Sequence, residues 1–228
     1  MEALIKHLSQ FVTPRRFELF NQVAAIRTRY LTLLLENIYQ PQNASAVLRT
    51  CDCLGIQDVH IVEDQNPYTL NPDVELGAAQ WLTLHRYNSP DQGINEAIQK
   101  LKKRGYRIVA TTPHQGDVSL TNYDLTRGKS ALLFGTELTG LSPQAINQAD
   151  EFLRIPMYGF TESYNISVSA AITLFELTRQ LRQSNIPWRL APQELNQLLL
   201  DWLRQNIKQA DQIEKRYNFD RERKESCS

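Results

Sequence analysis

Residues 152–176 read FLRIPMYGFTESYNISVSAAITLFE, and this stretch decides the fold. Phe152 to Ile155 is a short apolar run typical of the end of a buried strand, and Pro156 stops it. A polar, turn-rich loop follows over residues 159–165. The next segment has apolar residues at the spacing of a buried helix. They are Ile166, Val168, Ala170, Ala171, Leu174 and Phe175. Such strand–loop–helix units bring backbone groups to ligands in α/β sheets, although an ordinary βα turn has the same pattern.

The remaining chain alternates strands and helices. We expect strands at 30–38, 58–63, 81–87, 107–111 and 130–134. Between them, Asn43 is expected to cap a helix that ends at Gly55, and further helices are expected from Ser89 to Gly105 and from Ser142. This order predicts an α/β fold with a mostly parallel sheet.

Helices are predicted at both ends of the chain. The first two cover 2–12 and 14–29, with Thr13 as the cap of the second, and a single long helix covers about 191–217. We therefore divide the chain into an N-terminal helical extension at 1–29, a core at 30–184 and a C-terminal helical extension and tail at 185–228.

The composition is that of a soluble globular protein. The chain has 228 residues, 42% hydrophobic and 22% charged, with a formal net charge of zero. No run approaches ~18 apolar residues and the N-terminus does not resemble a signal peptide, so no membrane association is expected. Cys51, Cys53 and Cys227 are badly spaced for zinc or disulfides, which favours a cytoplasmic protein without a metal.

With no net positive charge, any affinity for RNA must come from local basic patches. Six arginines are candidates, and each also fits an ordinary solvated face. They are Arg15, Arg16, Arg27, Arg29, Arg179 and Arg182. We predict that they contact RNA.

Several common catalytic motifs are absent: the sequence has no nucleophile elbow, no phosphate-binding P-loop and no dinucleotide fingerprint. Polar loops at 37–43, 135–140 and 156–165 each follow a strand and are expected to share one crevice. The residues alone do not indicate what binds there.

Three motifs resemble a known family. They are ENIYQPQNASAVLRTCDCLG at 36–55, SALLFGTELTGLS at 130–142 and IPMYGFTESYNISVSAAITLFE at 155–176. In this order they resemble the SPOUT superfamily of knotted RNA methyltransferases, and within it the tRNA (guanosine-2'-O-)-methyltransferases. The resemblance implies a C-terminal trefoil knot that holds S-adenosylmethionine, and a homodimer with the acceptor site at its interface. It also implies methyl transfer to a ribose 2'-hydroxyl in the tRNA D-loop.

The resemblance also implies site residues. Arg49 would clamp an RNA phosphate and stabilise the developing alkoxide, Asn43 and Glu137 would orient it, and Ser163 and Asn165 would position the loop and ribose. The cofactor would be held by loops at Thr111, Gly135 and Ile155 to Tyr164. Two alternatives stay open: a ribosomal RNA 2'-O-methyltransferase, and a non-catalytic RNA-binding module. A decayed site would have lost at least one of the five catalytic candidates, which argues against the second.

Overall fold

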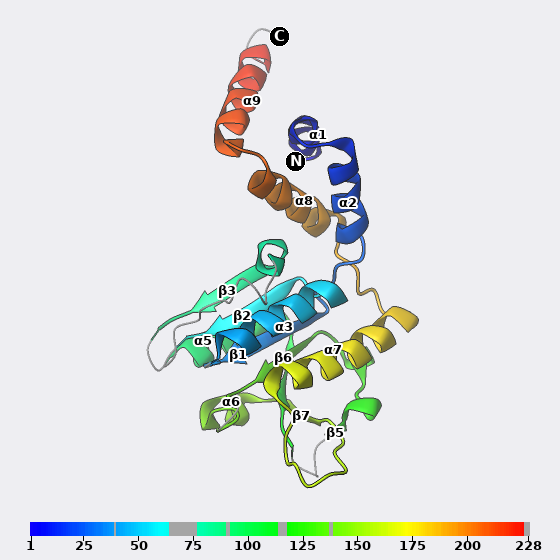
Figure 1. The fold of residues 1–228 in the computed structure, drawn as a ribbon. Helices are drawn as coiled ribbons and strands as arrows, with labels where there is room; N and C mark the ends of the chain where they lie inside the picture. Colours follow the sequence, from blue (N-terminus) through cyan, green and yellow to red (C-terminus); the bar gives the residue numbers. More distant parts are fainter. Residues whose placement is uncertain (39, 64–76, 90–91, 114–117, 137–138, 226–228) are drawn as a thin grey trace. The chain divides into compact units, whose positions relative to one another are not determined.

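The protein forms two compact units in a computed structural model that describes residues 1–38, 40–63, 77–89, 92–113, 118–136 and 139–225 (Figure 1). Unit 1 consists of Met1–Arg27 together with Arg189–Ser228, and unit 2 of Thr28–Trp188. Within the described ranges, no helix is long and apolar enough to cross a membrane. The two ends of the chain, which the sequence suggests are separate extensions, thus fold together in one unit.

Unit 2 is built on a seven-stranded sheet with the order β3-β2-β1-β6-β4-β7-β5. Every neighbouring pair of strands is parallel, which confirms the prediction of a mostly parallel α/β fold. The strands are β1 (Leu31–Glu36), β2 (Asp58–Val62), β3 (Thr83–Tyr87), β4 (Arg107–Thr111), β5 (Val118–Ser119), β6 (Ser130–Phe134) and β7 (Glu151–Arg154). The two-residue β5 was not predicted, because it lies in a segment that reads as a loop.

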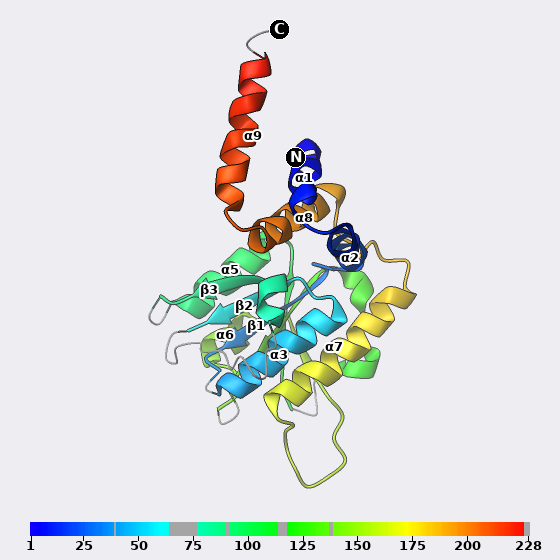
Figure 2. The same ribbon diagram turned by 45° about the horizontal axis from the view of Figure 1, so that its top comes forward.

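Helices cover both faces of this sheet. On one face α3 (Pro41–Leu54) and α7 (Ile166–Gln183) lie side by side, as both views show (Figures 1 and 2). On the other lie α5 (Gly93–Lys103) and α6 (Pro143–Gln148). Alternate residues of β1 serve the two cores: Leu33 and Leu35 pack toward α3 and α7, and Leu34 toward α5. Short 3₁₀ turns η2 (Ala78–Trp81), η3 (Leu120–Asn122) and η4 (Leu125–Arg127) complete the unit.

The start of α3 differs from the prediction. The helix begins at Pro41 with Gln40 as its cap residue, so Asn43 lies inside the first turn and does not cap it. Proline at the first helical position fixes the backbone for a helix start, which sets the boundary three residues earlier. The helix ends as predicted, with Gly55 in the left-handed conformation at φ 77°.

Unit 1 contains α1 (Glu2–Leu8), η1 (Ser9–Phe11), α2 (Pro14–Ala24), α8 (Pro192–Asn206) and α9 (Ala210–Glu225). Thr13 caps α2 as predicted, its Oγ1 accepting from the Arg16 amide at 3.2 Å. That helix ends at Ala24, short of the predicted Arg29. The single helix predicted over 191–217 is wrong: it is divided between α8 and α9, where Gln209 adopts φ 58°. A left-handed residue cannot continue a right-handed helix.

Candidate functional site

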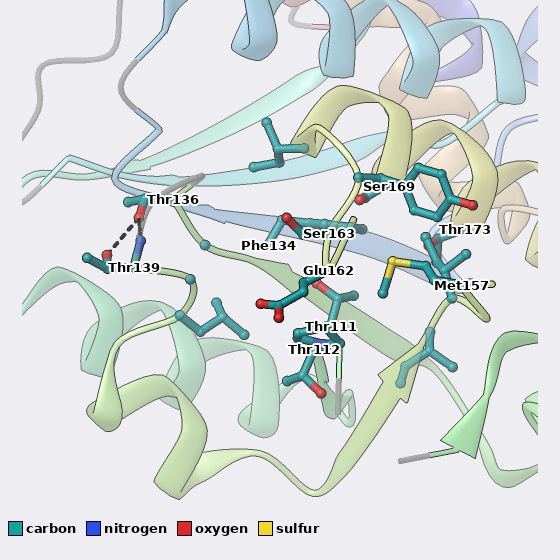
Figure 3. A pocket seen from close by; sticks show the side chains of 18 of the residues that line it. Thr111, Thr112, Phe134, Thr136, Thr139, Met157, Glu162, Ser163, Ser169 and Thr173 are labelled. Atoms are coloured by element: carbon teal, nitrogen blue, oxygen red, sulfur yellow. Dashed lines mark hydrogen bonds between the residues drawn. The ribbon is translucent and has the colours of Figure 1, made fainter. Parts of the chain in front are cut away.

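A pocket of about 430 Å³ lies at the carboxyl ends of β4, β6 and β7 (Figure 3). Ligands of open parallel sheets bind at this edge, and the volume is within the usual range for small-molecule sites. Its walls come from the ends of these strands, the loops that follow them, and the first turns of α7. The lining residues include Thr111, Thr112, Phe134, Gly135, Thr136, Thr139, Gly140, Leu141, Ile155, Met157, Glu162, Ser163, Tyr164, Ser169 and Thr173.

The loop after β6 closes tightly on itself. The main chains of Thr136 and Gly140 exchange two hydrogen bonds of 3.0 and 3.1 Å, and the hydroxyls of Thr136 and Thr139 lie 2.7 Å apart. A Cβ on Gly135 would lie 2.2 Å from the carbonyl carbon and oxygen of Gly140. The glycine is therefore required by the loop's own main chain.

Glu36, which was not among the predicted site residues, holds the end of this loop by a hydrogen bond. Its side chain is buried at the end of β1, and a carboxylate oxygen accepts from the Ser142 amide at 2.9 Å. Ser142 in turn caps α6, accepting from the Ala145 amide at 3.2 Å. Glu36 ends the otherwise apolar run YLTLLLE, and a charged residue at the end of a buried strand is the signal that identifies it.

The loop after β7 supplies the opposite wall. Met157, Glu162 and Ser163 line the pocket, as Figure 3 shows. Asn165 ends the loop and caps α7, its Oδ1 accepting from the Ser167 amide at 2.9 Å. The side-chain nitrogen of Asn165, Nδ2, also donates to Asn43 Oδ1 at 3.2 Å. This contact ties the start of α7 to the first turn of α3.

Seven of the nine predicted catalytic and cofactor-binding residues fall into two groups. The structure brings Thr111, Gly135, Ile155, Ser163 and Tyr164 into the lining of one pocket. It joins Asn43 to Asn165 by a hydrogen bond.

Arg49 lies apart from both groups. It is exposed on α3, is not among the residues that line the pocket, and has no hydrogen bond or ion pair within the described part of the chain. Glu137 lies outside the described residues.

Two of the arginines predicted to bind RNA, Arg27 and Arg29, have contacts within the protein. Arg27 is 1% exposed and its guanidinium lies 5.5 Å from the ring centre of Trp202, so it stabilises the interior of unit 1. Arg29 forms an ion pair with Asp58, Nε to Oδ1 at 3.0 Å. Burial of Asp58 opposes its ionisation, but His85, whose Nε2 lies 3.6 Å from Oδ2, and the charge of Arg29 lower the pKa of this carboxyl.

The other four candidate arginines are exposed. Arg179 makes a two-pronged contact with Glu176, at 2.8 and 3.1 Å. Arg182 donates to the Leu54 carbonyl at 2.8 Å and so caps the end of α3. Arg16 donates to Asn206 Oδ1 at 3.0 Å within unit 1, and Arg15 is exposed on the same helix.

A buried histidine lies in the sheet between β1 and β3. The His60 ring stacks on His85 with 4.4 Å between ring centres, and its Nδ1 lies 2.9 Å from the Tyr87 hydroxyl. Burial, together with the neighbouring His85, lowers the pKa of His60 from 6.5 to about 3. His60 is therefore a neutral, structural residue.

The family model described as "SpoU rRNA Methylase family" matches residues 30–175. The chain belongs to the SpoU methylase family. A tRNA (guanosine(18)-2'-O)-methyltransferase from Borreliella burgdorferi is 45% identical over 211 residues, which are 92% of this chain and 94% of that enzyme. The resemblance to SPOUT methyltransferases deduced from the three motifs is confirmed.

Solved structures of SpoU proteins have the same fold. The A. aeolicus TrmH/SpoU tRNA modifying enzyme has a TM-score of 0.75 and 27% identity, covering 86% of this chain and 98% of its own. The SpoU methyltransferase AviRb from Streptomyces viridochromogenes, solved in complex with the cofactor AdoMet, has a TM-score of 0.60 and 24% identity. It covers 72% of this chain and 65% of AviRb. The pocket at the ends of β4, β6 and β7 is therefore built on a SpoU methylase scaffold.

Proposed function

We propose that this protein transfers a methyl group from S-adenosylmethionine to the ribose 2'-oxygen of a guanosine in the D-loop of tRNA. The observation that carries the proposal is the similarity to the Borreliella tRNA enzyme over 211 residues. This match extends beyond the family region at 30–175 and so includes end helices. That extension favours tRNA over ribosomal RNA as the substrate.

The pocket residues fit the proposed cofactor. Leu141, Ile155 and Met157 offer apolar surface for a flat ring, and the Glu162 carboxylate complements a positive charge. S-adenosylmethionine supplies, when bound, a methyl group on a positively charged sulfur. We assign its binding to the main chain and side chains at Thr111, Gly135, Ile155 and Tyr164. Thr111 Oγ1 donates to the Leu133 carbonyl at 2.6 Å, so its hydroxyl joins β4 to β6. We therefore assign cofactor contacts at this residue to its main chain.

The acceptor hydroxyl must lose a proton as it is methylated. Arginine keeps its charge at neutral pH, so Arg49 is better suited to bind an RNA phosphate and stabilise the developing alkoxide than to remove the proton. The Asn43–Asn165 bond would keep Ser163 beside the pocket by fixing the end of its loop. Glu137 remains a proposed partner of Arg49 on the basis of the motif match.

We infer that the protein acts as a homodimer in which Arg49 serves the partner's pocket. Arg49 is exposed and does not line the pocket of its own chain. On the neighbouring helix α7, Val168 and Phe175 are 43% and 61% exposed and lie seven residues apart, on one side of the helix. An exposed apolar stripe of this kind is typical of a surface that a second subunit covers.

Two further features belong to the same proposal. A trefoil knot in the C-terminal half of the sheet is supported by the strand order β6-β4-β7-β5, in which β7 joins the sheet between two earlier strands. RNA contacts are assigned to Arg15 and Arg16, which are exposed, with Arg179 and Arg182 as further candidates. A cytoplasmic location stays a prediction.

The test is a methyl-transfer assay with a choice of substrates. Purified protein and labelled S-adenosylmethionine are incubated with bulk RNA from cells that lack the enzyme, and the labelled RNA is separated by size. Label in tRNA is expected. Label in ribosomal RNA alone would support the alternative substrate, and no label in any RNA would support a non-catalytic RNA-binding module.

A further inference from the structure

Unit 1 contains a groove of about 620 Å³ between its N-terminal segment and α9. Three aromatic rings, those of His7, Phe11 and Tyr217, line it, and Arg216 and Arg221 lie among them. We propose that this groove binds an unpaired nucleotide of the tRNA, with the base against the rings and a phosphate near the guanidinium groups. This inference rests on the proposed function and adds a substrate subsite outside the methyl-transfer pocket.

The rings of the groove are arranged as a stacking platform. His7 stacks on Tyr217 with 4.6 Å between ring centres and 29° between planes. Phe11 meets His7 edge-on at 5.5 Å and is itself 50% exposed. The interior of unit 1 is made elsewhere, by residues such as Leu8 and Trp202. Rings left partly open beside a hollow present flat faces on which an unstacked base can lie.

The charges around the groove suit a nucleotide. Arg216 projects into solvent with 87% of its side chain exposed, and its Nε lies 4.0 Å from Asp220. This exposed pair is weak, so Arg216 can turn to a phosphate at little cost. The Asp220 carboxylate is an acceptor for the N–H groups on a base edge.

The division of charge between the units points the same way. Unit 1 has 12 Lys and Arg against 9 Asp and Glu, a formal charge of +3, and unit 2 has 13 against 16, a charge of −3. The zero net charge of the chain thus conceals a basic unit, which a polyanion would prefer.

A protein helix is a poorer occupant of this groove. Helix α9 has 10 charged residues among its 16, so its surface offers no continuous apolar stripe for another helix. The aromatic cluster is a small apolar area within charged surroundings. RNA that is recognised outside duplexes is bound in this way, by stacking on rings beside basic side chains.

The test compares tRNA affinity among variants over a range of salt concentrations. Tyr217→Ala removes the ring and is expected to weaken tRNA binding by about tenfold with an unchanged salt slope, because stacking releases no counterions. Tyr217→Phe keeps the ring and should bind as the unaltered protein does. Arg216→Gln should weaken binding and also lower the salt slope by about one.

The matched control is Phe219→Ala, since Phe219 is a 63% exposed ring of the same helix that does not line the groove. It should leave tRNA affinity unchanged. If Tyr217→Ala alters the helical signal in circular dichroism, Phe11→Ser takes its place, because Phe11 is half exposed and its loss disturbs packing less. Equal tRNA affinity of Tyr217→Ala, or of Phe11→Ser in its place, and the unaltered protein would overturn the inference.

The same preparations separate this inference from the proposed function. Methyl transfer to tRNA by the unaltered protein is measured alongside binding. If the unaltered protein methylates tRNA while the groove variants bind like it, only the groove assignment is wrong. If the unaltered protein neither binds nor methylates tRNA, the proposed function fails, and the groove assignment fails with it.

Discussion

Replacing Gly135 by alanine tests how the pocket is built. The added Cβ would lie 2.2 Å from two atoms of Gly140 and 2.3 Å from the Leu141 amide, all of them main chain. Carbon atoms in contact are normally about 3.5 Å apart, so the loop must move by roughly 1 Å or more. Overpacking of this kind costs about 1–3 kcal/mol. If the strain is relieved only by opening the loop, cofactor affinity falls by roughly tenfold to a hundredfold.

Titration calorimetry with S-adenosylmethionine measures this loss directly. The matched control is Gly159→Ala in the loop after β7, where the added Cβ would come no closer than 4.0 Å to the Thr161 amide. This control should bind the cofactor as the unaltered protein does. Circular dichroism should show both variants folded. An affinity of Gly135→Ala within twofold of the unaltered protein would refute the reasoning, since it would mean that the loop accommodates the methyl group without disturbing the pocket.

Four further predictions concern other parts of the molecule. Asn165→Ala should lower the free energy of unfolding by about 1 kcal/mol, because it removes the α7 cap. Asn165→Asp should keep that stability but lose methyl-transfer activity, because it removes the side-chain N–H that donates to Asn43; activity equal to that of the unaltered protein would contradict this. Arg49→Lys should abolish most methyl transfer at unchanged cofactor affinity. Mixed dimers of Arg49→Ala and Gly135→Val subunits should regain part of the activity if the site is shared, and no recovery in dimers shown to be mixed would exclude the shared site. The double variant Arg15→Ala, Arg16→Ala should bind tRNA less tightly, and the slope of log affinity against log salt concentration should be smaller by up to about two. An unchanged slope would mean that both arginines lie on solvent-exposed surface that does not contact RNA. Between pH 6.5 and about 3 the unfolded chain protonates His60 and the folded chain does not, so the free energy of unfolding should fall as pH falls, by up to about 1.4 kcal/mol per pH unit. In denaturation at several pH values, His60→Gln should show a weaker dependence of this free energy on pH, and an identical dependence would contradict the assigned pKa.

The parallel sheet was predictable because its signals are local. Buried strands such as β1 and β6 are continuous apolar runs, and Gly55 marks the end of α3 with a residue suited to a left-handed backbone. The end helices were harder to divide. Nothing in the periodicity of 191–217 marks the break at Gln209, because non-glycine residues adopt positive φ only where tertiary packing imposes it.

The site was predictable in part, through the motifs. They identified Gly135, but the reason it must be glycine is a contact with Gly140, five residues later, which only the folded loop creates. They did not identify Glu36 as a support, because its partner is the amide of Ser142, more than a hundred residues away. Arg27 carried the same sequence signal as Arg15, and only packing against Trp202 separates the two.

The most direct test of the central claim is methylation of a single tRNA in which one oxygen is removed. An unmodified tRNA transcript and a copy carrying 2'-deoxyguanosine at the D-loop acceptor are each incubated with the protein and labelled S-adenosylmethionine. Methylation of the ribose oxygen protects the next phosphodiester bond from alkali, so the labelled product should be an alkali-resistant dinucleotide. We predict this product from the first RNA and no label in the second. Label of equal intensity in the deoxy copy would contradict the account, because the methyl group would then be on a base or on another nucleotide.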